Sequence, residues 1–359
     1  MPRALGGLLL LVLLAAGCSG AAPAAAPSPA PTPTMTDPTL EATRPPTAEP
    51  TSTPTPTPTP DPLAPLTGEP VADHAVLQRP VAAVKIDNAR PARPQQGLGE
   101  ADVVFEELVE GGGTRFLALF QSVDPGLVGP VRSGRDVDAA LLPAFSPVLG
   151  ISGAAAPTYA VLRAAGLLVF EEGQANAFAR DSTRRAPYNL YASVAMLWAA
   201  GADLPEAVPA WAINAQVPAG GAPAAEVVLH FAPQTSARWT WDPAAQAWLR
   251  AQDGAAHLLA GGVQVDADNV VIARMAVTNG GGVDSAGSPT VDIAVAGEGD
   301  ALVLRDGQQF AARWRKAGPN EQLEWLTADG QPLPLDRGRT WVELVPTAAA
   351  VAVTPPPPA

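Results

Sequence analysis

Three short apolar runs in the first half of the chain predict buried β-strands. They span residues 81–86, 101–109 and 115–120, and the segment Phe116-Leu117-Ala118-Leu119-Phe120 leaves no polar face. Strands of this kind are usually covered on both sides of their sheet. We therefore expect a mixed central sheet covered by helices. The candidate helices span 137–145, 158–165 and 193–200, the last capped by Ser193.

The second half shows a different pattern, in which short runs alternate with turn signals. Asp253-Gly254, Asp306-Gly307 and Asp329-Gly330 are typical of tight hairpins. Trp239 and Trp241 share one strand face; such a face could stack on sugars, although tryptophan in a small β domain is more often part of the core. The fold prediction is an α/β (α+β) domain over 66–219 and a smaller β-rich domain over 224–346, acting as a packing partner or spacer outside the site. We expect a disordered tail over 347–359.

The first residues read as an export signal. Arg3 supplies a positive charge, residues 8–14 are apolar, and the segment ends at Cys18, the only cysteine in the chain. A single cysteine excludes a disulfide framework. The end of the segment resembles the bacterial lipobox. We expect a signal peptide over 1–18, lipid attachment at Cys18, and anchoring at the extracytoplasmic face of the cell membrane.

Residues 19–65 are dominated by alanine, proline and threonine. Proline fixes φ and removes backbone donors, so this segment cannot build a core. We expect a disordered, extended tether that ends at about Pro65.

Charge and residue usage exclude several classes of protein. The net charge of −13 argues against a nucleic-acid binder, which needs a basic face. One cysteine and three scattered histidines (His74, His230 and His257) do not form a zinc site, and no nucleophile elbow or phosphate loop is present. We expect no metal and no cofactor. Only two of the 22 basic residues are lysines, and the remaining arginines suit bidentate anion binding.

Arginines follow or begin several of the apolar runs, close to carboxylates. A sheet that aligns the ends of these runs would bring the arginines into one anion-accepting cleft, roofed by Gly111 to Gly113. The hypothetical ligand-binding set is Arg93, Arg115, Arg132, Arg135, Arg184, Asp87, Glu106, Asp181 and Asn189.

Several ordered motifs resemble the DUF3048 (YerB-like) family of bacterial lipoproteins. They are Lys85-Ile86-Asp87-Asn88, Arg93-Pro94-Gln95-Gln96-Gly97-Leu98, Thr114-Arg115-Phe116-Leu117, Gly129-Pro130-Val131-Arg132-Ser133 and Ala186-Pro187-Tyr188-Asn189-Leu190-Tyr191. The resemblance covers about 65–346. It implies an envelope-anchored α/β domain with a smaller β-rich partner, and it carries no established activity. The family pattern often has histidine where this chain has Ile151 and Tyr188.

Three functions stay open at this point. The arginines could bind an anionic cell-wall or lipid-linked ligand. They could instead serve an envelope enzyme that transfers or hydrolyses phosphoryl or glycan groups with carboxylates as acid and base. In the third alternative they form only structural ion pairs. Open convergence of the arginines favours binding or catalysis, and complete pairing favours a scaffold.

Overall fold

The computed structural model describes residues 61–284 and 287–358 of the chain. The predicted signal segment with Cys18, and most of the predicted tether, lie outside these residues. Folded structure begins before the predicted boundary at Pro65. Ala64 is buried, its N–H donates to Glu69 O and its carbonyl accepts from Gly68 N, both at 2.8 Å. A turn can bury proline-flanked residues even where regular structure is impossible.

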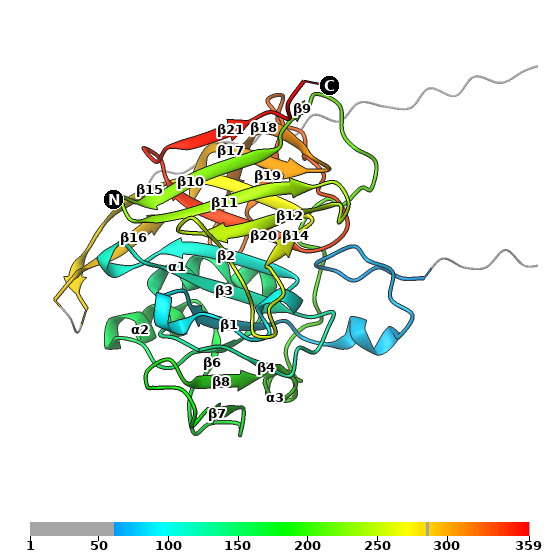
Figure 1. Ribbon diagram of the computed structural model, residues 1–359. Helices are drawn as coiled ribbons and strands as arrows, with labels where there is room; N and C mark the ends of the chain where they lie inside the picture. Colours follow the sequence, from blue (N-terminus) through cyan, green and yellow to red (C-terminus); the bar gives the residue numbers. More distant parts are fainter. Residues whose placement is uncertain (1–60, 285–286, 359) are drawn as a thin grey trace, which may run out of the picture. The chain divides into compact units, whose positions relative to one another are not determined.

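A twelve-stranded mixed sheet runs through the described chain (Figure 1). Its main path is β19-β18-β17-β15-β20-β2-β3-β1-β5-β6, with β16 and β9 paired at its side. The strands are β1 (Ala82–Asp87), β2 (Val103–Leu108), β3 (Thr114–Phe120), β5 (Val148–Gly150), β6 (Leu168–Phe170), β9 (Ala222–Pro223), β15 (Asn269–Val283), β16 (Pro289–Ala294), β17 (Gly297–Arg305), β18 (Gln308–Lys316), β19 (Glu324–Leu326) and β20 (Thr340–Pro346). The three predicted apolar strands are confirmed as β1, β2 and β3.

The two halves of the chain meet inside this sheet. β20 pairs in parallel with β2, from Val103 opposite Thr340 to Glu107 opposite Leu344, and in parallel with β15 on its other side. The β-rich second half therefore continues the sheet of the first half. Local sequence patterns identify strands but carry no information on which distant strand lies beside them.

A second sheet of six strands has the order β13-β12-β11-β10-β21, with β14 beside β12. Its strands are β10 (Glu226–Ala232), β11 (Thr235–Asp242), β12 (Ala247–Gln252), β13 (Ala255–Ala256), β14 (Asp266–Ala267) and β21 (Val351–Thr354). β21 corrects the expected disordered tail, because alternating Val351 and Val353 pair with Leu229 and Val227 of β10. The predicted Asp253-Gly254 turn joins β12 to β13, with φ of 51° and 83°.

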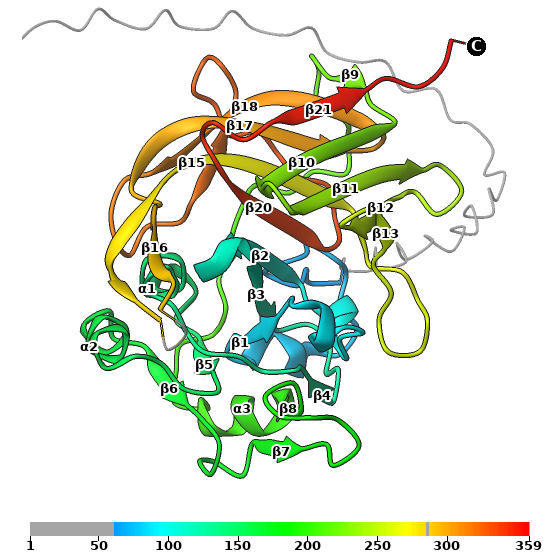
Figure 2. The same cartoon turned by 60° about the vertical axis from the view of Figure 1, so that its left-hand side comes forward.

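Helices cover only part of the large sheet. α1 (Asp136–Leu141) and α2 (Ala156–Ala164) pack on one face, where Leu141 and Leu162 share a core with Leu117. The other face carries α3 (Val194–Ala200), a small sheet of β4 (Leu127–Val128), β8 (Leu190–Ser193) and β7 (Phe178–Arg180), and the second sheet (Figure 2). The expectation of a helix-covered sheet is thus corrected, since the protein is mostly β and a second sheet does much of the covering.

Two further details follow from the sequence. Ser193 caps α3 as predicted, accepting a hydrogen bond from Met196 N at 3.4 Å. Trp239 is fully buried and its ring centroid lies 5.4 Å from that of Trp341, so it belongs to the core. Five short 3-10 helices complete the described elements: η1 (His74–Gln78), η2 (Arg90–Ala92), η3 (Leu98–Glu100), η4 (Glu110–Gly112) and η5 (Pro143–Phe145).

Candidate anion-binding site

A cavity of about 650 Å³ opens where β1 and β2 end and β3 begins. Antiparallel pairing sets Asp87 of β1 opposite Arg115 of β3, and Arg115 in turn opposite Glu107 of β2. Directly opposed residues project to the same face of a sheet. Polar side chains at the ends of three buried strands are therefore gathered at one edge. This cavity, which we call the Arg115 pocket, is lined by Asp87, Arg90, Arg93, Arg115, Arg132, residues 109–114, residues 232–235, Asp253 and Asp284, among others.

The glycine loop forms one wall of the Arg115 pocket. Gly111 and Gly112 have φ of 71° and 77°, which glycine adopts at little cost. The Gly112 carbonyl accepts a hydrogen bond of 2.6 Å from Thr235 Oγ1, and a Cβ on Gly112 would meet Ala232 Cβ at 3.2 Å. The loop is thus fitted closely against the β10–β11 turn.

The second half of the chain contributes to this wall. Residues 232–235 and Asp253 line the pocket, and Asp253 binds Arg93 with an N–O distance of 3.1 Å. The expectation that residues 224–346 lie outside the site was therefore wrong. It followed from reading the two halves as separate domains, whereas the continuous sheet brings the β10–β11 and β12–β13 turns to the end of β1.

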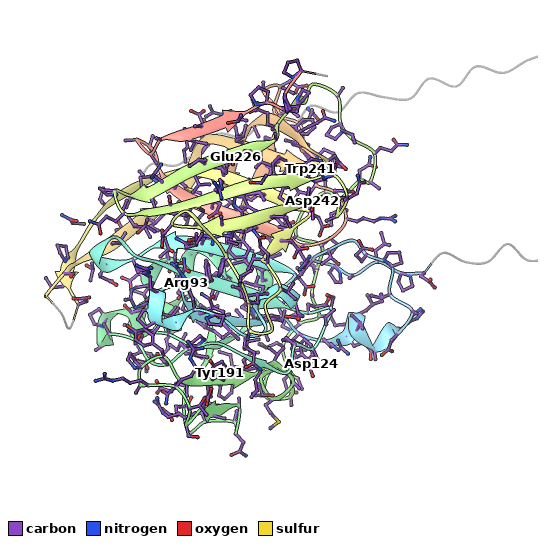
Figure 3. All side chains as sticks on the ribbon, viewed as in Figure 1. Arg93, Asp124, Tyr191, Glu226, Trp241 and Asp242 are labelled. Carbon is purple, nitrogen blue, oxygen red and sulfur yellow. The ribbon has the colours of Figure 1, made fainter. Side chains whose placement is uncertain are left out.

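Three of the five predicted arginines line the Arg115 pocket: Arg93, Arg115 and Arg132. Arg93 lies beside the strands β1 to β3 (Figure 3) and donates to the Asn88 carbonyl at 2.8 Å as well as to Asp253. Arg132 donates from Nε to Asp87 Oδ2 at 2.8 Å. Arg90, which the sequence set did not include, is exposed at the rim, and its guanidinium has no partner among the described residues.

The other two arginines are used differently. Arg135 lies outside the lining and forms an ion pair with Glu110, which does line the pocket. Arg184 donates to the backbone carbonyls of Pro91, Ala92 and Pro94 at 3.0, 2.8 and 3.1 Å, so it holds the 90–94 loop in place.

The remaining predicted residues do not join the pocket. Asp181 accepts hydrogen bonds from Thr183 within its own turn, and Asn189 accepts one from Arg180 at 2.8 Å. Glu106 is fully buried on the sheet face opposite Arg115, because side chains alternate along β2 and Glu107 is the residue paired with Arg115.

Arg115 is the residue of the pocket whose charge is least balanced. It is 8% exposed, Nη1 donates to the Ser133 carbonyl at 2.8 Å, and Nε is buried without a hydrogen-bond partner. No described carboxylate lies within ion-pair distance of it. Burial first, and then the neighbouring Arg135 guanidinium, lowers the pKa of Arg115 to about 10. A buried cation that is not paired costs free energy, so an anion entering the pocket would offset that cost.

A second group of charges lies on the face of the sheet opposite Arg115, behind Asn88 and Thr114 of the pocket lining. Arg250 of β12 is fully buried, forms an ion pair with Glu106, and lies 3.9 Å from a Glu343 oxygen. Burial, and then the Glu106 charge, raises the pKa of Glu343 well above its ordinary value. We name these three residues the Arg250 cluster.

His257 extends the Arg250 cluster toward the Arg115 pocket. Arginine only donates, so the contact of 2.7 Å between Arg250 Nη1 and His257 Nδ1 makes Nδ1 the acceptor. His257 Nε2 then donates to Gln95 Oε1 at 2.9 Å, and Gln95 Nε2 donates to the Asp87 carbonyl at 3.0 Å. Burial, followed by the charges of Arg250 and Arg93, lowers the pKa of His257 well below its ordinary value, which fits this neutral tautomer.

A third group, which we name the Lys85 triad, is Lys85, Glu107 and Asp138. All three side chains are fully buried, and Lys85 forms ion pairs with both carboxylates. Asp138 also accepts from Arg135 N at 2.8 Å, which ties the start of α1 to the triad. Burial raises the pKa of Glu107 to about 7, although the Lys85 charge acts in the opposite direction.

Sequence reasoning missed both Lys85 and Arg250 as buried charges. The sequence indicates burial for Lys85 but not for Arg250. Lys85 interrupts an apolar strand, and a charge at such a position indicates a buried partner. Arg250 stands in an alternating strand like any exposed residue. Within residues 61–284 and 287–358, no group of three metal-ligating side chains is placed to hold an ion, and no helix is long and apolar enough to cross a membrane.

Comparison with known protein families shows which family the chain belongs to. Residues 66–206 match the family model described as "Protein of unknown function (DUF3048) N-terminal domain", and residues 227–342 match the corresponding C-terminal domain. The chain belongs to the DUF3048 family. Both matched segments contribute strands to the large sheet of this DUF3048 protein and residues to the Arg115 pocket.

A named relative and a solved structure support this membership. The DUF3048 chain is 28% identical over 310 residues to "Putative lipoprotein YerB" of Bacillus subtilis (strain 168), covering 81% of this chain and 88% of that protein. It is also similar to the crystal structure of YerB protein from Bacillus subtilis. That match has a TM-score of 0.69 and 27% identity, and it covers 81% of this chain and 99% of the other.

Proposed function

We propose that this protein is a membrane-anchored extracytoplasmic lipoprotein that binds an anionic cell-envelope ligand in the Arg115 pocket. The observation that carries the proposal is the Arg115 guanidinium, nine-tenths buried beside an open cavity and without a carboxylate partner among the described residues. Two other arginines of this chain, by contrast, have carboxylate partners. Arg250 is buried against Glu106, and Arg135 is paired with Glu110.

The neighbours of Arg115 support an anionic ligand. Arg132 uses only Nε for its bond to Asp87, so both terminal nitrogens are without a hydrogen bond to a described residue. Its side chain is 26% exposed. A phosphate or carboxylate placed between Arg115 and Arg132 would receive charge-assisted hydrogen bonds from two guanidinium groups.

Replacing Arg115 with glutamine is expected to weaken the binding of pyrophosphate roughly 10- to 100-fold, because a hydrogen bond to a charged group contributes about 1.5–3 kcal/mol. Isothermal titration at low salt measures the affinity, which should fall further as salt is added. Arg115→Gln should leave the melting temperature unchanged or raise it, since it removes an unpaired buried charge.

Arg313→Gln is the matched control, because that arginine forms only exposed ion pairs on β18, with Glu298 and Asp300. It should leave pyrophosphate affinity unchanged. If Arg115→Gln binds pyrophosphate as tightly as Arg313→Gln, or if it loses several degrees of melting temperature, Arg115 is a structural residue and the binding proposal is wrong.

The anchor is tested separately. Replacing Cys18 with alanine is expected to move the protein from the membrane fraction to the soluble fraction, because a thioether-linked lipid needs the cysteine sulfur. Replacing Ser19, the next residue, with alanine should leave it with the membrane. Equal partitioning of Cys18→Ala and wild-type protein would contradict lipid attachment at this site.

A further inference from the structure

A second cavity, of about 490 Å³, adjoins the Arg115 pocket. It is lined by Pro91, Arg184, Arg185, Ala186 and Tyr188, and we call it the Arg185 cavity. Its lining contains two guanidinium groups and no carboxylate. The Arg115 pocket, in contrast, contains four carboxylates, three of which bind an arginine.

One chain connection and one side-chain contact link the two cavities. Arg90 lines the Arg115 pocket and the next residue, Pro91, lines the Arg185 cavity. Arg132, which also lines the Arg115 pocket, has its Cζ atom 5.7 Å from the centroid of the Tyr188 ring in the Arg185 cavity. The terminal nitrogens of Arg132 therefore lie at the boundary between the two.

Hydrogen bonds from Arg184 hold the boundary between the two cavities in place. Besides the three carbonyls of the 90–94 loop, Arg184 donates to Tyr191 Oη at 2.6 Å. This arginine thereby joins the loop that carries Arg90 to the segment that carries Arg185 and Tyr188. Arg185 itself is exposed, and its guanidinium has no partner among the described residues.

We propose that the ligand is a linear anion with more than two phosphate groups, one bound at Arg115 and Arg132 and a later one at Arg185. The inference rests on the proposed function, because it takes the Arg115 pocket as the first subsite. A single phosphate would reach only one cavity and leave Arg185 unused. A chain of ionised groups, such as a phosphodiester or a polyphosphate, follows the row of cations from Arg115 past Arg132 to Arg185.

The test compares a short and a long probe. Pyrophosphate occupies one subsite, and linear polyphosphate of about ten units reaches both. Arg185→Gln should weaken polyphosphate binding roughly tenfold, as expected for one lost charge-assisted contact, and change pyrophosphate binding by less than about twofold. Arg337→Gln is the charge-matched control, since Arg337 is exposed, has no side-chain partner among the described residues and lines neither cavity.

The outcomes separate the two proposals. If Arg185→Gln and Arg337→Gln bind polyphosphate equally, the second subsite is wrong, while a loss of pyrophosphate binding in Arg115→Gln would still support the first. If neither probe depends on Arg115, the proposed function fails and the extension fails with it. Both exposed arginines can be replaced with little effect on folding, which thermal melting of the two variants verifies.

Discussion

Replacing Arg250 with methionine is expected to lower the free energy of unfolding by about 3–5 kcal/mol. Arg250 is fully buried among apolar rings, with Cζ at 5.0 Å from the Trp341 ring and 5.4 Å from the Phe116 ring. The variant would leave Glu106 in this environment without its cation. Glu106 would keep neutral donors, among them Thr114 Oγ1 at 2.7 Å and Asn88 Nδ2 at 3.2 Å, but no cation.

Urea unfolding followed by tryptophan fluorescence measures the loss. Arg238→Met is the matched control, because Arg238 lies on the neighbouring strand and forms an exposed pair with Glu226 at 3.6 Å. Such a pair contributes about 0–1 kcal/mol. Adding Glu106→Gln to Arg250→Met should recover part of the stability, since it removes the unpaired buried charge of the Glu106 carboxylate. A loss no larger than that of Arg238→Met would contradict the role assigned to the Arg250 cluster.

Replacing Lys85 with methionine is expected to destabilise the protein by a similar amount, about 3–5 kcal/mol at pH 8. Lys85 is the cation of the Lys85 triad, and without it two carboxylates would face each other inside the core. One Glu107 oxygen is already buried without a hydrogen-bond partner, so the site has no spare donor to compensate.

The loss in Lys85→Met should shrink as the pH falls. The pKa of Glu107 is raised from 4.5 to about 7 in the folded protein. The stability that its protonation contributes is therefore complete below about pH 4.5 and is lost as the pH rises through about 7. The Lys85 charge lowers this pKa, so Glu107 of the variant binds its proton more tightly than Glu107 of the wild type, and the bound proton offsets more of the loss as the pH falls from 8 to 5. Unfolding at both pH values checks this, and Lys85→Met with Glu107→Gln should remove most of the difference. An equal loss at both pH values would show that Glu107 is not the titrating group.

The local elements of the fold could be predicted because a buried strand or a capped helix has a recognisable pattern within a few neighbouring residues. Phe116 to Phe120 has no polar face, and Ser193 stands where a cap is needed, so β3 and α3 follow from a few residues each. The pairing of β2 with β20 could not be predicted, because the two strands are more than 200 positions apart and nothing in either sequence selects the other. The contact between the two predicted domains depends on this pairing and was therefore not predicted, and the second wall of the Arg115 pocket was missed for the same reason.

The site itself was only partly predictable. Glu106 and Glu107 are adjacent, so alternation places them on opposite faces, but which face holds Arg115 depends on the register between β2 and β3. Arg184 looks like any other loop arginine until the 90–94 carbonyls are known to surround it. Sequence reasoning could therefore predict cations at strand ends. It could not distinguish Arg115, which has no carboxylate partner, from Arg135, which has one.

The insertion of β20 between β15 and β2 constrains how genes of this type can recombine. A chain divided between residues 206 and 227, where the two family models part, would leave β2 as a bare edge on one product and β20 as a bare edge on the other. Such apolar edges invite aggregation. An unrelated module could therefore replace either half only if it supplied a strand that fits the same gap.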